Sequence, residues 1–442
     1  MNNSEIRKIC LGKFEEAEDL FLEKIYPNIE TYRKGDCKIK CLDKNGKPLI
    51  GKAVKITQKK HDFKYGANIF MLDEFASEED NKAYREEFAK YFNLATIPFY
   101  WKGLEPEKGK PRYDADSPKE YRRPAPDLCL EYCREKGIDG KLHCLFYDKF
   151  LPDWMPRNDE KEMLLLYEKR FAEIAKRYSG KLYEVEVLNE LLSEWWWTGQ
   201  SVLSERRDIL ELMFSLAEQY FQNDTLVIND GNYIPEIGQM DYRHPYYMLI
   251  DAALSKGVRI DKIGVQNHIY CGCVKSQEEE IHSCEPFFDP MLILKGFEVL
   301  SSFDKPLEIT EVTIPTVGEG EEAEEIQAEL LRYLYTIWFS IPQMESIVYW
   351  NTVDGTAYDA PGWMENNCRG GLLHSDFSPK KSAVMLKELF SKIWHTELEL
   401  VTDEDGCINF RGFYGDYSAT SAGEEISFGI HKNTSNSYEM VW

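Results

Sequence analysis

The sequence predicts a (β/α)₈ TIM barrel, an α/β fold, with a small accessory β-sandwich formed by the N- and C-terminal segments. The main observation is a series of eight short apolar runs between residues 65 and 354, with helical stretches between them. Near-continuous apolar strands that alternate with helices are typical of a parallel sheet covered by helices. A doubly wound open sheet is the alternative, but no GxGxxG fingerprint follows the first run.

The terminal segments predict a different kind of structure. Apolar residues at helical spacing, among them Leu11, Phe14 and Phe21, predict one or two helices over residues 1–34. Two strands are predicted within residues 36–58, on either side of an Asn45-Gly46 turn. After residue 395 the helical pattern stops, and three or four short strands with Gly and Asp turns are expected to join them.

The eight apolar runs predict the strands of the barrel in chain order. They are YGANIF (65–70), LATIPFY (94–100), KLHCLFY (141–147), YEVEVLNE (183–190), TLVIND (225–230), KIGVQNHIY (262–270), PLEITEVT (306–313) and SIVYWNTVD (346–354). The predicted domain boundaries are 1–60 for the N-terminal helix and strands, 61–395 for the barrel, and 396–442 for the C-terminal strands.

Composition and charge exclude several function classes. The 442 residues include 53 Lys and Arg against 77 Asp and Glu, which gives a net charge of −24. This balance argues against nucleic acid and against an anionic membrane surface as partners. No stretch reaches the roughly eighteen apolar residues that would suggest a membrane span. Because no secretory signal is visible, we expect a cytoplasmic protein with reduced thiols. The sequence indicates no oligomeric state.

Two glutamates end two of the predicted barrel strands. The fourth run ends in Asn189-Glu190, and the seventh contains Thr310-Glu311. Active sites of (β/α)₈ barrels lie at the C-terminal ends of the strands, so both carboxylates are expected in one cleft. Paired carboxylates are what cleavage of a glycosidic bond needs: one protonates the leaving oxygen and the other stabilises or attacks the anomeric carbon. A lone glutamate after a strand is more often a surface residue, but two such glutamates favour a catalytic pair.

Several motifs, in the same order and spacing, resemble glycoside hydrolase family 10, the xylanase family. They are LEPEKG (104–109), LHCLFYDKFLPDWM (142–155), EVLNELL (186–192), VINDGNY (227–233), IGVQNHIY (263–270), LEITEVT (307–313) and YWNTVD (349–354). The resemblance covers nearly the whole barrel, and the flanking segments are similar to those of the longer members.

The resemblance implies a role for each matched residue. Glu190 would be the general acid/base and Glu311 the nucleophile, with Asn189 bonding the sugar 2-hydroxyl and His268 keeping Glu311 ionised. The further expected substrate-binding residues are His143, Gln266, Trp350, Tyr147, Trp101 and Tyr233. Neither a cofactor nor a metal is expected. The resemblance also implies retention of anomeric configuration, with carboxylates about 5–5.5 Å apart.

The sequence departs from the family where the non-reducing-side sugar is bound. Thr96, Ile97 and Tyr100 stand where Glu, Asn and Lys are expected, and Tyr147-Asp148 replaces a Trp-His pair. We therefore expect a retaining hydrolase of β-1,4-linked xylan-type oligo- or polysaccharide. The alternatives are a glycosidase for a different β-linked glycan or glycoside, and a non-catalytic glycan-binding barrel.

Two other clusters are candidates for binding. The sequence Trp195-Trp196-Trp197 directly follows the Glu190 segment and is a candidate platform for the leaving-group sugar. Cys271, Cys273, His282 and Cys284 have a spacing that could hold zinc, although free thiols or a disulfide are the alternatives.

Overall fold

The structure is a computed structural model that describes residues 1–193 and 199–442. The chain divides into two compact units. The barrel unit contains residues 1–14, 65–330 and 343–383, and the sandwich unit contains residues 15–64, 331–342 and 384–442. The domain boundaries predicted after residues 60 and 395 stay a prediction.

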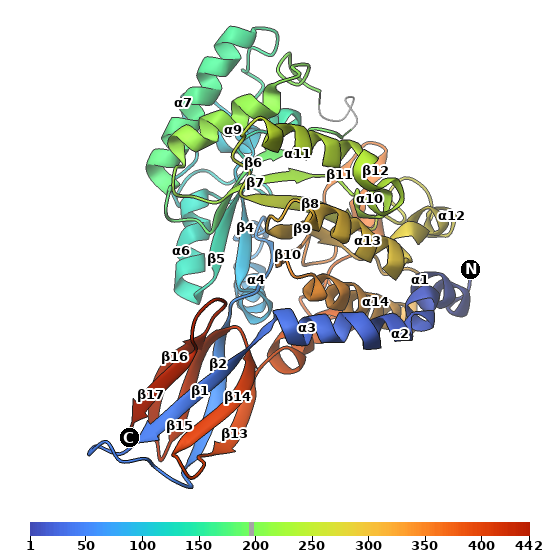
Figure 1. Ribbon diagram of the computed structural model, residues 1–442. Coiled ribbons are helices and arrows are strands. Elements are labelled where there is room, and N and C mark those ends of the chain that lie inside the picture. The colour runs from blue at the N-terminus through green and yellow to red at the C-terminus, as the bar shows by residue number, and fades with distance from the viewer. Residues whose placement is uncertain (194–198) are drawn as a thin grey trace. The chain divides into compact units, whose positions relative to one another are not determined.

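Eight parallel strands form a closed barrel in the order β10-β3-β4-β5-β6-β7-β8-β9 (Figure 1). Their bounds are β3 Lys64–Asn68, β4 Leu94–Pro98, β5 Asp139–His143, β6 Glu184–Asn189, β7 Leu226–Asp230, β8 Lys262–His268, β9 Leu307–Thr313 and β10 Met344–Tyr349. Each strand overlaps one of the eight apolar runs, so the predicted barrel is confirmed. Every residue of β4, β6, β7, β8 and β9 is buried, so none of these strands has a solvent-exposed face.

Helices connect consecutive barrel strands. They are α4 Glu78–Tyr91, α5 Trp101–Leu104, α6 Pro126–Lys136, α7 Glu160–Tyr178, α9 Ile209–Tyr220, α10 Ile234–Met240, α11 Pro245–Ser255, α12 Gln277–Glu280, α13 Pro290–Ser301 and α14 Gly320–Ser340, with α15 Lys381–Glu388 after the last strand. Local signals explain where several begin. Ser77 accepts a hydrogen bond from the Asp80 amide at the start of α4, and Asp159 does the same for Glu162 at α7.

Two sheets form the predicted β-sandwich. Their orders are β14-β1-β17 and β13-β2-β15-β16, with bounds β1 Lys34–Leu42, β2 Ala53–His61, β13 Glu397–Val401, β14 Cys407–Phe413, β15 Gly415–Ser421, β16 Glu424–Ile430 and β17 Ser437–Val441. Alternate residues of β1 and β2, such as Ile39 and Ile56, are fully buried in the shared core. The Asn45-Gly46 turn is present, but the two strands that flank it lie in different sheets.

The N-terminal segment forms helices α1 Asn3–Glu16, α2 Glu18–Leu20 and α3 Tyr26–Tyr32, with Leu11, Phe14 and Phe21 buried as the helical spacing predicts. In the two described ranges, no helix has both the length and the apolar character needed to cross a membrane.

Candidate active site

The carboxylates of Glu190 and Glu311 meet at the side chain of Gln266. Gln266 lies on β8, and its Nε2 donates to Glu190 Oε1 at 3.0 Å and to Glu311 Oε1 at 3.1 Å. The two oxygens are therefore separated by no more than the sum of these distances. That limit lies below the carboxylate separation of about 6.5 Å at which inverting glycosidases begin. The turn after β6 and the middle of β9 thus place two carboxylates within hydrogen-bond distance of the Gln266 amide.

Glu311 is buried among hydrogen-bond donors. Only 4% of it is exposed, its Oε1 also accepts from Asn229 Nδ2 at 3.1 Å, and its Oε2 lies 3.2 Å from His268 Nε2. Burial raises the pKa of Glu311 to about 8; attraction to His143 opposes this rise and repulsion from Glu190 adds to it. The free site therefore keeps a proton near neutral pH.

His268 contacts Glu311 as a neutral imidazole. Burial lowers the pKa of His268 to about 4, so the ring carries no charge near neutral pH. Its Nδ1 lies 2.8 Å from the Thr313 hydroxyl, which can donate to it and leave the proton on Nε2, facing Glu311. His268 thus supports the Glu311 carboxylate by a hydrogen bond. The imidazole would become positively charged only at a lower pH, near its pKa of about 4.

Glu190 lies in the turn after β6. Its backbone has a φ of +54°, which is unusual for a residue with a side chain, and its amide donates to the Asn229 carbonyl at 3.1 Å. Its Oε2 accepts a hydrogen bond from the Tyr147 hydroxyl. Lys149 is also near: burial lowers the pKa of Lys149 to about 8 despite attraction to Glu190 and Glu365. Unlike Glu311, Glu190 is partly exposed.

Asn229 connects the two glutamates, and sequence reasoning missed it. Besides Glu311, its Nδ2 donates to Asn189 Oδ1 at 2.8 Å and to Glu186 Oε1 at 3.2 Å. The Thr310 hydroxyl donates to Asn229 Oδ1 at 2.5 Å. Asn229 could have been found from its position near the end of the fifth apolar run, in the motif VINDGNY, because the ends of barrel strands carry the site residues.

A layer of buried charges lies inside the barrel next to these residues. The Lys141 ammonium is within 2.8 Å of Glu308, 3.1 Å of Glu184 and 3.6 Å of Glu186, and all four side chains are fully buried. Burial alone would lower the pKa of Lys141, but the three carboxylates outweigh it and raise the pKa. His143 Nδ1 lies 2.7 Å from Glu186, whose charge raises the pKa of His143 against the effect of burial.

The remaining predicted substrate-binding residues fall into two groups. The Trp350 ring lies 5.4 Å from that of His143, next to the carboxylates, and the Tyr233 hydroxyl donates to Asp230 at 3.0 Å, behind the Glu190 turn. Trp101 belongs elsewhere: it packs against Trp154 and Tyr167 in a separate aromatic group. Residues 195–197, the predicted tryptophan platform, lie outside the described residues.

The structure brings the thiols of Cys271 and Cys284 together but does not gather all four candidate zinc ligands. The His282 side chain is 62% exposed and lies 2.6 Å from Glu285, while Cys273 Sγ is 3.1 Å from the sulfur of Cys368. Across the described ranges, one group offers three potential ligand atoms within 4.8 Å of one another: His143, Cys144 and Glu186. This group does not fit a metal well, since His143 and Glu186 already bond each other and burial raises the pKa of the Cys144 thiol well above its usual value.

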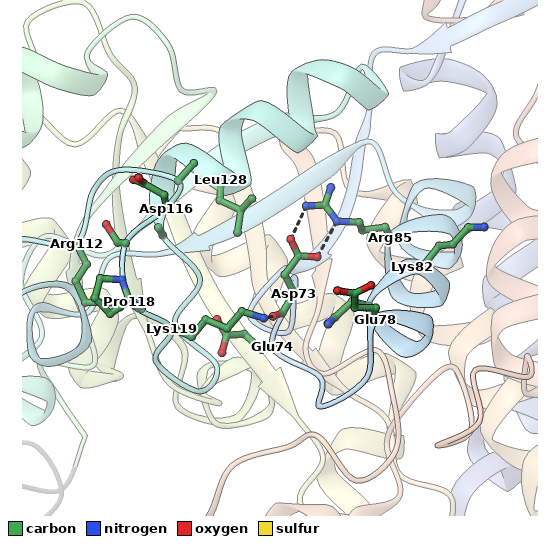
Figure 2. Close-up of a pocket in the computed structure, with 14 residues that line it drawn as sticks. Asp73, Glu74, Glu78, Lys82, Arg85, Arg112, Asp116, Pro118, Lys119 and Leu128 are labelled. Atoms are coloured by element: carbon green, nitrogen blue, oxygen red, sulfur yellow. Dashed lines mark hydrogen bonds and ion pairs between the residues drawn. The ribbon is translucent and has the colours of Figure 1, made fainter.

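A cavity of about 670 Å³ is lined by loops that follow β3 and β4 and by residues of α4 and α6 (Figure 2). Asp73 and Arg85 form a two-point ion pair in its wall, at 2.7 and 2.6 Å. Lys119 donates to the Asp73 carbonyl. The lining residues include both charge signs and no aromatic ring. None of the predicted site residues lines this cavity, so the chemistry is argued from the carboxylates.

Comparisons with known proteins give a family and several relatives. The family model described as glycosyl hydrolase family 10 matches residues 58–386. The chain is 25% identical over 408 residues to the anti-sigma-I factor RsgI6 of Acetivibrio thermocellus, covering 90% of this chain and 46% of that protein. It is 23% identical over 422 residues to endo-1,4-beta-xylanase 1 of Arabidopsis thaliana, covering 92% of this chain and 39% of that protein. The chain thus spans less than half the length of these two relatives.

Solved structures share the fold. The crystal structure of xylanase 10B from Thermotoga petrophila RKU-1 in complex with xylobiose matches with a TM-score of 0.59 and 20% sequence identity, covering 75% of this chain and 95% of that one. Native xylanase 10B from Thermotoga maritima matches with the same TM-score of 0.59 and 21% identity, covering 75% and 96%. At this level of identity the likeness supports the barrel architecture.

Proposed function

The chain belongs to glycosyl hydrolase family 10, and from this premise we propose that it cleaves β-glycosidic bonds with retention of anomeric configuration. Glu311 acts as the nucleophile and Glu190 as the general acid/base. The observation that carries the proposal is the Gln266 amide that donates to both carboxylates, at 3.0 and 3.1 Å. This upper limit lies below the carboxylate separations of inverting glycosidases and favours direct attack by one of the two acids.

The proposed reaction has two steps. In the first, Glu190 donates its proton to the leaving oxygen while the Glu311 carboxylate attacks the anomeric carbon and forms a glycosyl–enzyme. In the second, Glu190 takes a proton from water, which displaces Glu311 and releases the sugar. Asn189 has its amide oxygen engaged by Asn229, so its amide nitrogen is the group available to the sugar 2-hydroxyl. His268, Asn229 and Gln266 hold Glu311 through hydrogen bonds.

We propose xylan-type β-1,4-linked oligo- or polysaccharide as the first substrate class to test. The similarity to endo-1,4-beta-xylanase 1 of Arabidopsis thaliana supports it. The residues at the end of β4 and just after it favour a different β-linked glycoside as the alternative. The Tyr100 hydroxyl bonds His143, and Thr96 and Ile97 are almost fully buried, so this segment differs from the expected Glu-Asn…Lys grip. Hydrolysis of xylo-oligosaccharides beside other β-glycosides separates the two.

Chemical rescue tests the mechanism. Glu311→Gly should abolish turnover of an activated aryl β-glycoside, and added azide should restore cleavage with an α-glycosyl azide as product. Glu190→Ala should cleave activated aryl glycosides far better than unactivated ones, because only the latter need protonation of the leaving group. Glu278→Gln, at an exposed carboxylate, is the matched control. Full activity of Glu311→Gly without azide would refute the assignment.

A glycan-binding role without turnover is the second candidate, and the similarity to an anti-sigma-I factor favours testing it. On this view Glu190→Ala and Glu311→Ala would leave oligosaccharide binding nearly unchanged, and the wild type would release no sugar. Calorimetric titration together with product analysis on the same preparations distinguishes binding alone from hydrolysis.

A further inference from the structure

Five aromatic side chains form a wall beside the two carboxylates: Phe70, Tyr100, Tyr147, Phe150 and Trp350. Their rings contact one another, with centroid distances such as 5.1 Å for Phe70 and Trp350 and 4.7 Å for Tyr100 and Phe150. The Tyr100 hydroxyl lies 2.7 Å from His143 Nε2, which is 4.0 Å from Glu311 Oε1. Because a sugar attached to Glu311 must lie against the groups around that carboxylate, this aromatic wall faces the glycone.

Arg123 lies on the aromatic wall. Its guanidinium carbon is 4.4 Å from the centroid of the Tyr100 ring, 5.3 Å from that of Phe150 and 5.5 Å from that of Phe70. Its Nη1 donates to the Arg122 carbonyl at 2.7 Å. In the part of the chain that the structure describes, no carboxylate forms an ion pair with it, and Arg123 is half-buried. Burial lowers its pKa to about 10, so the group is still charged at neutral pH.

Arg122 adds a second cation behind the first. It is only 6% exposed and has a φ of +60°. Its Nη2 donates to Asn351 Oδ1 at 3.0 Å, but its Nε and Nη1 have no hydrogen-bond partner among the described residues. The Glu365 carboxylate is connected to it through Asn351, whose Nδ2 lies 3.5 Å from Glu365. A buried guanidinium with two unused donors is costly in the empty protein.

The charges on this side of the site differ from those of the whole molecule. The chain carries 77 acidic residues and a net charge of −24, yet among the described residues the side-chain hydrogen bonds of these two neighbouring arginines go to an amide oxygen and a carbonyl. Glu365 attracts Arg122 and Glu120 attracts Arg123, but neither carboxylate forms an ion pair with them in the described ranges. An arginine stacked on an aromatic ring keeps the edge of its guanidinium for a planar, two-point contact with a carboxylate.

We propose that Arg123, with Arg122 behind it, recognises a carboxylate on the glycone, so that the preferred substrate has a hexuronosyl residue on the non-reducing side of the cleaved bond. This inference rests on the proposed function. The aromatic wall contacts the sugar ring, and the guanidinium edge binds its carboxylate. Arg123 therefore sets the preference between acidic and neutral sugars, a choice that Glu190 and Glu311 do not make.

Matched substrates test the proposal. The 4-nitrophenyl β-glycosides of glucuronic acid and of glucose differ only in the carboxylate, and 4-nitrophenyl β-1,4-disaccharides with either sugar at the non-reducing end extend the comparison by one subsite. We expect the wild type to prefer the acidic member of at least one pair. Arg123→Gln should lower kcat/KM for that acidic member by roughly 10- to 100-fold and for the neutral member by less than about 3-fold.

Further variants separate recognition from structure. Arg123→Lys keeps a positive charge but not the two-point contact, and should lose part of the preference. The surface variant Arg134→Gln, on the exposed side of α6, should change neither substrate. Circular dichroism and thermal melting establish that each variant is folded. Equal loss of both substrates in Arg123→Gln and Arg123→Lys would mean that Arg123 only supports the aromatic wall and would overturn the proposal.

A binding measurement distinguishes failure of this proposal from failure of the proposed function. Calorimetric titration of wild type with methyl β-glucuronide and with methyl β-glucoside does not depend on turnover. Tighter binding of the glucuronide, lost in Arg123→Gln and weakened by salt, would support recognition even if no glycoside is hydrolysed. Hydrolysis of neutral glycosides together with equal or weaker binding of the glucuronide would refute recognition and leave the hydrolase assignment standing.

Discussion

Glu311 determines how the proposed reaction depends on pH. Burial and the repulsion from the Glu190 carboxylate across Gln266 raise the pKa of Glu311. Because the pKa of Glu311 is raised to about 8, the site holds a proton at neutral pH, and the first step of the proposed reaction needs a proton for the leaving oxygen. We expect kcat/KM for an aryl β-glycoside to fall as the pH rises above about 8. A value of kcat/KM that still increases beyond pH 9 would contradict a need for the proton that the site holds below this pH.

The same residue is expected to reduce the stability of the fold. A carboxyl group whose pKa is higher in the folded than in the unfolded state binds its proton more tightly when folded, so stability falls as the pH rises from about 4.5 to about 8. Glu311→Gln should therefore unfold at a higher temperature than wild type at pH 8 and at nearly the same temperature at pH 4.5. Calorimetry at both pH values measures this. A stabilisation that is equal at both pH values would show that ionisation is not its cause.

Sequence reasoning could reach the glutamates but not the groups that hold them. Glu190 and Glu311 each follow an apolar run, so the barrel rule places both at the mouth. Asn229, Glu186 and Tyr100 act through partners on other strands. A sequence without its strand register does not reveal which interior positions face each other.

The turn directly after β6 is held by a carboxylate from the next strand. Asp230, the last residue of β7, accepts from the Leu192 amide at 2.9 Å and from the Tyr233 hydroxyl at 3.0 Å. We expect Asp230→Ala to lower kcat by roughly 10- to 100-fold with a smaller change in KM, because Glu190 would lose its fixed position. Asp230→Asn keeps one acceptor oxygen and should be intermediate. A kcat equal to that of wild type in Asp230→Ala would show that the position of Glu190 does not depend on Asp230.

At the level of elements, the strands that are buried were the ones easiest to predict from the sequence. The eight barrel strands could be predicted because strands buried on both faces are rich in apolar residues, and each apolar run overlaps a strand. The strands around Asn45-Gly46 were also predicted, but their placement in opposite sheets was not, since a turn signal does not say whether its flanking strands pair. Trp101 matches a tryptophan of the family motif, which suggested a substrate-binding role. In the structure its ring packs against Trp154 and Tyr167, a contact that the motif did not reveal.

For the whole molecule, removal of β17 should destabilise the sandwich. β1 lies between β14 and β17, and Met440 and Trp442 are buried in the sandwich core. Deletion of residues 437–442 would expose the edge of β1 and remove both side chains, a loss of roughly 3–5 kcal/mol or more. We expect a lower melting temperature and visible light scattering. Val441→Ala, at a residue that is 54% exposed, is the control and should melt like wild type. An unchanged melting temperature of the deletion would contradict the role of β17.

The mixed origin of the two sheets has a consequence for biosynthesis. β1 and β2 leave the ribosome before any barrel strand, yet their sheet neighbours β13, β14, β15 and β17 are translated after the last one. Both early strands must therefore remain without those partners while the whole barrel is made. A messenger RNA truncated after the barrel would yield a chain in which β1 and β2 have unpaired edges, and chaperones and proteases recognise such edges. The sandwich can therefore form completely only after the ribosome has translated Val441.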